Sequence, residues 1–109
     1  MRVLLWFVLL ALAAPLRAAP PATAPMAPPV RLGLCAACHG NDGIATLPGV
    51  PNLAGQRLDY LRQALADYRS GRRNVAPMRA AIGPLTPAEL DQLAAWYASR
   101  PPCAPAAKR

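Results

Sequence analysis

Cys35-Ala36-Ala37-Cys38-His39 is the stretch of this 109-residue chain that decides its fold. Two thiols three residues apart, with a histidine directly after the second, form the pattern of covalent c-type haem attachment. On a helix these positions share one face, because helical neighbours are three and four residues apart. Both sulfurs can therefore bond one porphyrin edge, and His39 can bind the iron as its proximal ligand. The stretch predicts one covalently attached haem c.

Three other kinds of site use similar residues. A zinc site of Cys35, Cys38, His39 and Cys103 has suitable ligands, but structural zinc sites usually space the histidine well away from the cysteine pair. A dithiol redox centre normally follows a strand, and no strand pattern precedes Cys35. A structural disulfide in a small exported domain is the third alternative. The haem site is favoured over all three.

The N-terminal residues predict export. Arg2 precedes an unbroken apolar run, Val3–Ala14, and small residues follow it. These features indicate a signal peptide over residues 1–19, cleaved near Ala18 or Ala19, with Ala13 or Ala14 as the alternative. A membrane-spanning helix needs about 20 apolar residues, so a membrane anchor is the weaker interpretation. We expect a periplasmic protein, in an oxidising compartment that suits haem attachment.

The rest of the chain divides into a leader, one domain and a tail. Residues 20–29 are rich in proline and alanine, which predicts a semi-rigid or disordered leader. Residues 30–100 are expected to form one domain of roughly seventy residues. The core of so small a domain usually needs an additional stabilising element, such as a covalent haem. The tail, residues 101–109, contains Cys103. An odd cysteine in an exported chain suggests a free thiol or an intermolecular disulfide.

Helix signals run through the domain, and no alternating strand pattern does, so the predicted fold class is all-α. A first helix is expected over about residues 29–39. A second is expected from about Leu58 to Ser70, ended by Gly71 in a left-handed conformation. The last begins at a capping box over residues 86–89, with proline at its first position, and ends near residues 99–100.

A haem iron needs a second axial ligand unless it binds a substrate. His39 is the only histidine of the chain, so two histidines cannot hold the iron. Met1 leaves with the signal peptide and Met26 lies in the leader, which leaves Met78. We expect Met78 in a loop that folds over the far face of the porphyrin and binds the iron. A gap-filling core methionine is the alternative.

Several motifs together resemble a known family. They are the haem motif followed by Gly40, the segment from Pro51 to Gln56, the pair Pro77-Met78, and a last helix ending in Trp96-Tyr97. Over about residues 31–99 the chain resembles a class I cytochrome c of the small bacterial periplasmic type.

The resemblance implies the cytochrome c fold, with about three main helices around one haem. It implies that the backbone carbonyl of Pro51 accepts a hydrogen bond from the second ring nitrogen of His39. It also implies that Leu53, Ile82, Leu85 and Leu93 line the haem cavity.

The first helix departs from the family pattern. A glycine and an aromatic residue usually stand eight and four positions before the first cysteine, where Ala27 and Arg31 stand here. We expect Gly33 and Leu34 to pack against Trp96 or Tyr97 instead.

The expected function follows from the two axial ligands. Iron with both axial positions filled can exchange an electron but offers no open position to oxygen or peroxide. We therefore expect an electron carrier between larger redox complexes, and no enzyme. The alternatives are a haem enzyme or gas sensor with a displaceable or absent sixth ligand, and a cytochrome subunit docked in an oxidoreductase.

The net charge of the chain indicates its partners. The formal charge is +7, and removal of Arg2 and Arg17 with the signal peptide leaves ten basic and five acidic residues. This balance favours redox proteins with acidic docking surfaces, or peripheral association with anionic lipids. Nucleic acid is not an expected partner. Four arginines surround Met78 and form a docking rim, an anchor for the haem propionates, or an ordinary solvated patch: Arg69, Arg72, Arg73 and Arg79.

Overall fold

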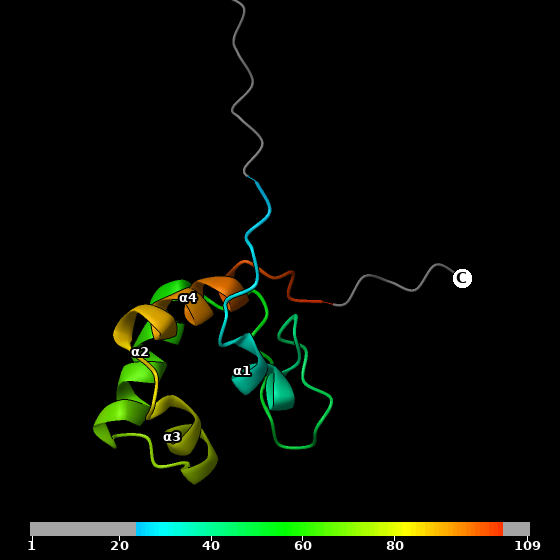
Figure 1. Cartoon of the computed structure of the whole chain (residues 1–109). Helices are drawn as coiled ribbons and strands as arrows, with labels where there is room; N and C mark the ends of the chain where they lie inside the picture. Colours follow the sequence, from blue (N-terminus) through cyan, green and yellow to red (C-terminus); the bar gives the residue numbers. More distant parts are fainter. Residues whose placement is uncertain (1–23, 104–109) are drawn as a thin grey trace, which may run out of the picture.

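The computed structural model describes residues 24–103. Figure 1 shows these residues as a small helical domain. Its helices are α1 (Leu32–His39), α2 (Leu58–Ser70), α3 (Ala76–Ile82) and α4 (Pro87–Ala98). No strand occurs within the described range, so the all-α prediction is confirmed. None of its helices has the length and apolar character needed to cross a membrane.

The predicted ends of the domain stay predictions. The signal peptide over residues 1–19 lies outside the described residues. Only residues 24–29 of the leader and 101–103 of the tail are described.

The packing of α2 against α4 carries much of the core. On α2, Leu61 and Ala64 are buried, and Gly71 ends the helix with a φ of 83°. Thr86 caps the start of α4, and its side chain accepts a hydrogen bond from the backbone of Glu89 at 3.2 Å. The Glu89 carboxylate accepts one in return from the Thr86 backbone at 2.8 Å. The predicted capping box is therefore present, and both helices follow their predicted bounds closely.

A helix, α3, replaces the loop that was expected around Met78. It packs against α2 and has Pro77 in its first turn, where proline costs no hydrogen bond. Seven residues are too few to show a clear apolar period, so the pattern did not reveal this helix. The prediction of a loop is wrong, and Met78 has a helical backbone.

The helix α1 is shorter than expected and packs through a different residue. It begins at Leu32, after the Pro28-Pro29 pair, and not near residue 29. Leu32 is 8% exposed and joins the core cluster that contains the aromatic residues of α4. Gly33 has no neighbour within 4 Å of a Cβ placed there, and Leu34 is 48% exposed. The expected packing of Gly33 and Leu34 is therefore wrong, because Leu32 takes that place.

Candidate haem site

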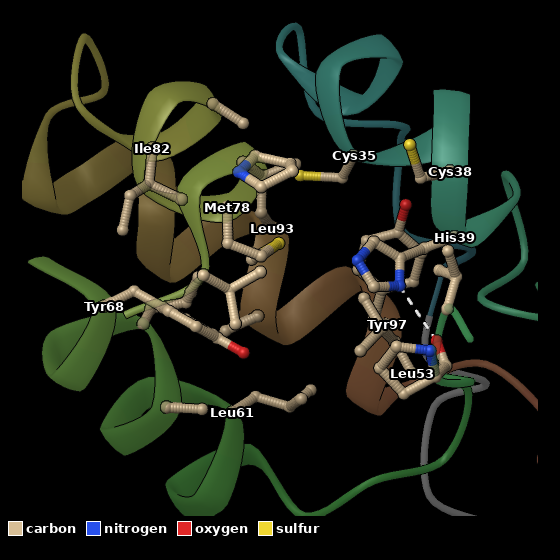
Figure 2. Close-up of a pocket in the computed structure, with 18 of the residues that line it drawn as sticks. Cys35, Cys38, His39, Leu53, Leu61, Tyr68, Met78, Ile82, Leu93 and Tyr97 are labelled. Carbon is tan, nitrogen blue, oxygen red and sulfur yellow. Dashed lines mark hydrogen bonds between the residues drawn. The ribbon is translucent and has the colours of Figure 1, made fainter. Parts of the chain in front are cut away.

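A cavity of about 510 Å³ lies among α1, the loop that follows it, α2, α3 and α4. Its volume is typical of a site for a small molecule or cofactor. Most of its lining is apolar, as Figure 2 shows for part of the wall. The lining includes all four residues that the family resemblance implied for a haem cavity: Leu53, Ile82, Leu85 and Leu93. The wall therefore suits a large apolar disc.

The haem motif occupies the last turns of α1 and borders this cavity. Cys35, Cys38 and His39 all line it, as their spacing on a helix predicts. Cys38 is exposed, while Cys35 is half-buried and His39 is buried. Burial raises the pKa of the Cys35 thiol. Two thiols and an imidazole thus stand together at one wall.

One hydrogen bond fixes the imidazole of His39. Its Nδ1 lies 2.9 Å from the backbone carbonyl oxygen of Pro51, and Figure 2 marks this contact. A carbonyl oxygen only accepts, so Nδ1 carries the proton and donates it. The other ring nitrogen, Nε2, is then left with a lone pair for a metal. The contact expected between His39 and Pro51 is present.

The loop that holds Pro51 is tied to a glycine near α1. The Gly43 carbonyl accepts hydrogen bonds from the backbone nitrogens of Leu53 at 2.8 Å and Ala54 at 3.1 Å. Gly43 has a φ of 77°, and a Cβ placed on it would lie 2.6 Å from the Ala54 nitrogen. Only glycine fits this close approach without movement. The close contact between Gly43 and Ala54 holds the loop that contains Pro51 beside His39.

Two buried aromatic side chains of α4 bind the residues directly after His39. The indole of Trp96 donates to the carbonyl of Asn41 at 2.7 Å, and the Tyr97 hydroxyl donates to the carbonyl of Gly40 at 3.0 Å. Burial is the main cause that raises the pKa of Tyr97, so its phenol keeps the donating proton. The sequence indicated this aromatic pair but not its hydrogen-bond partners.

Met78 borders the same cavity from α3. Its side chain is half-buried and packs against the core cluster. In Figure 2, Met78 enters the view from the α3 side and His39 from the α1 side. Both candidate axial ligands therefore belong to one cavity.

The alternative sites find little support in the described part of the chain. No disulfide joins Cys35, Cys38 or Cys103 within the described residues, and Cys103 is not among the residues that line the cavity. No group of three or more histidine, cysteine or acidic side chains in residues 24–103 could hold a metal ion. The four ligands proposed for zinc are therefore not assembled.

The cavity also has a polar side that the sequence did not single out as a unit. It is formed by Gln56, Tyr60, Tyr68 and Arg73. These residues lie before, on and just after α2. Only Arg73 belonged to a predicted cluster, because nothing in the sequence indicated that the two tyrosines lie beside it.

Comparison with known proteins gives a consistent result. The family model for cytochrome c matches residues 32–100. Cytochrome c-554(548) of Halomonas halodenitrificans is 38% identical over 73 residues, which cover 64% of this chain and 88% of that protein. Cytochrome c4 of Pseudomonas aeruginosa is 37% identical over 70 residues, which cover 64% of this chain but 35% of that protein.

A third relative has a name that states a role. The thiosulfate dehydrogenase electron acceptor of Thiomonas intermedia is 38% identical over 85 residues, which cover 77% of this chain and 39% of that protein. The chain thus matches most of one relative but little more than a third of the other two.

Proposed function

The chain belongs to the cytochrome c family, and on this basis we propose that it is a periplasmic electron carrier whose haem iron is held by His39 and Met78. It is an electron-transfer protein of the c type with a covalent haem c. The observation that carries the ligand assignment is that Cys35, Cys38, His39 and Met78 all border one apolar cavity. When bound there, the haem supplies an iron that changes its charge by one electron.

The four residues have distinct roles in this proposal. Cys35 and Cys38 would hold the haem through thioether bonds, and His39 would bind the iron through Nε2. The Pro51 carbonyl orients that ring and increases its basicity through the bond at 2.9 Å. Met78 would supply its thioether sulfur as the second protein ligand of the iron. A thioether ligand and an apolar wall both favour the reduced, less charged iron.

The lining of the cavity favours a carrier over an enzyme. No aspartate or glutamate is among the described residues that border it. The one histidine is committed to the Pro51 carbonyl through Nδ1. Peroxide or oxygen chemistry needs a side chain that moves protons at the reacting site. The polar side of the cavity has two tyrosines and an arginine, Tyr60, Tyr68 and Arg73, but the described lining has no carboxylate and no second histidine for that work.

We propose redox proteins with acidic docking surfaces as partners. Residues 67–79 contain four arginines and one acid, while the other described residues contain four arginines and four acids. The net positive charge of the described residues therefore lies on this segment, named here the arginine edge. Outside this segment, three ion pairs neutralise arginines with acidic side chains: Arg31 with Glu89, Arg57 with Asp59, and Arg62 with Asp91. An acidic partner would be steered towards the arginine edge.

Ligand binding to the purified protein tests the carrier against the enzyme or gas sensor. Ferric protein should bind cyanide slowly, ferrous protein should bind carbon monoxide slowly, and peroxide should not be turned over. Met78→Ala should bind both ligands readily, because its iron has an open position. Met26→Ala is the matched control, since Met26 is 44% exposed outside the helices. Immediate ligand binding by the unmodified protein, with peroxide turnover, would establish the alternative.

A further inference from the structure

Arg73 is the only lysine, arginine, aspartate or glutamate among the described residues that border the cavity. It lies between α2 and α3, and its side chain is 39% exposed. Most of the lining around it is apolar. A permanent cation therefore stands at the edge of a cavity that otherwise has little charge.

Two tyrosines of α2 hold this cation in place. The Arg73 guanidinium lies 5.6 Å from the ring centre of Tyr60 and 5.7 Å from that of Tyr68. Its Nη2 donates to the Tyr60 hydroxyl at 3.3 Å. Contacts with Tyr60 and Tyr68 raise the pKa of Arg73 above its ordinary value. Both tyrosines border the cavity as well.

The nearest carboxylate does not neutralise Arg73. Asp67 lies 3.9 Å from Arg73 Nε, at the limit of an ion pair. Its Oδ1 already accepts hydrogen bonds from Gln63 and Arg72. The backbone nitrogen of Arg73 donates to the Asp67 carbonyl at 3.0 Å, which fixes the turn after α2. Arg73 is thus positioned by this turn while most of its guanidinium donors remain available for a carboxylate.

The haem that the family binds has two propionate carboxylates in addition to its apolar ring. An ionised carboxylate against an apolar wall is strongly disfavoured unless a cation or hydrogen-bond donors receive it. The planar guanidinium of arginine matches a carboxylate with two parallel hydrogen bonds. We infer that Arg73, positioned by Tyr60 and Tyr68, binds a propionate carboxylate of the haem.

This inference rests on the covalent haem and does not depend on Met78 as the sixth ligand. The bound guanidinium keeps the propionate ionised near neutral pH and favours the reduced iron by its positive charge. Other titratable or charged groups face Arg73 or lie on elements packed near it. They are Tyr60, Tyr68 and Asp67 on α2, Arg72 in the following turn, Arg79 of α3 beside Gly71, and His39 across the cavity.

The midpoint reduction potential, measured from about pH 5 to about pH 8, tests the inference. Arg73→Gln should shift the ferrous-to-ferric ratio towards ferric by about tenfold at a fixed electrode potential, which equals about 59 mV. Its potential should also rise as pH falls, because a propionate without its cation takes up a proton in this range. Arg73→Lys should restore much of the potential.

Arg62→Gln is the matched control, because Arg62 pairs with Asp91, away from Arg73, and does not border the cavity. Its potential should stay close to that of the unmodified protein and vary as little with pH. If Arg73→Gln changes the potential no more than Arg62→Gln does, and its pH profile is unchanged, the inference is wrong. A retained far-red band from the methionine ligand separates this result from any failure of the Met78 assignment.

A measurement on the unmodified protein covers the case in which Arg73→Gln fails to retain haem. Infrared difference spectra between the two redox states are recorded with haem labelled by ¹³C at its propionate carboxyls. A propionate bound by Arg73 should show only ionised carboxylate bands over the same pH range. A labelled band from a protonated carboxyl on each propionate near neutral pH would overturn the inference.

Discussion

Replacement of Tyr97 by phenylalanine tests how α4 holds the segment after His39. The variant keeps the ring, which is 2% exposed, and removes only the hydroxyl that donates to Gly40 at 3.0 Å. The Gly40 carbonyl also accepts from the backbone nitrogen of Gly43 at 3.3 Å, so it is not left without a partner. The free energy of unfolding should therefore fall by the net value of one hydrogen bond, about 0.5–1.5 kcal/mol.

Urea denaturation of the ferric haem protein measures this loss. With a slope of about 1 kcal/mol per molar urea, expected for a small domain, the midpoint should fall by about 0.5–1.5 M at an unchanged slope. Tyr60→Phe is the matched control, because Tyr60 is 46% exposed and its hydroxyl contacts only the partly exposed Arg73. Its unfolding free energy should stay within about 0.5 kcal/mol. Equal midpoints for the two variants would refute the reasoning.

Three further predictions concern the loop, a helix start and docking. Gly43→Ala should destabilise the protein more than Gly49→Ala in urea: both residues have a φ of 77°, but only at Gly43 would the new Cβ lie 2.6 Å from a backbone nitrogen. The strain at Gly49 alone should cost about 1–3 kcal/mol. Thr86→Ala should lower the unfolding free energy by about 1 kcal/mol in the same assay, because it removes the cap of α4. Charge reversal of Arg72 and Arg79 should slow electron transfer to an acidic redox protein in stopped-flow mixing at low salt. The effect should shrink near 0.15 M salt, where the screening length is about 8 Å, and equal rates at all salt concentrations would contradict the docking proposal.

Local patterns predicted the parts of the fold that local forces decide. The capping box that begins α4 and the glycine that ends α2 act over three or four residues, so the sequence shows them directly. The haem motif is local in the same way, since one helical turn brings Cys35, Cys38 and His39 to one wall. The hydrogen bond from His39 to Pro51 spans twelve residues, and only the resemblance to a family predicted it.

Tertiary contacts decided what the sequence did not reveal. Trp96 and Tyr97 bind Asn41 and Gly40 across 55 and 57 residues, and no periodicity indicates those partners. The same holds for Arg73, whose two tyrosines become its neighbours only when the turn after α2 folds back.

The two wrong predictions also have a physical origin. The helix α3 has one recognisable start signal, Pro77, and is too short for an apolar pattern. The packing of α1 through Leu32 reflects the late start of that helix, which a pair of prolines sets.

The far-red absorption spectrum of the ferric protein tests the central claim, that Met78 is the sixth ligand of the haem iron. Thioether sulfur bound to ferric haem gives a weak charge-transfer band in this region. The unmodified protein and Met26→Ala should both show the band, and Met78→Ala should lack it. A band that is missing from the unmodified protein, or that survives in Met78→Ala, would contradict the assignment.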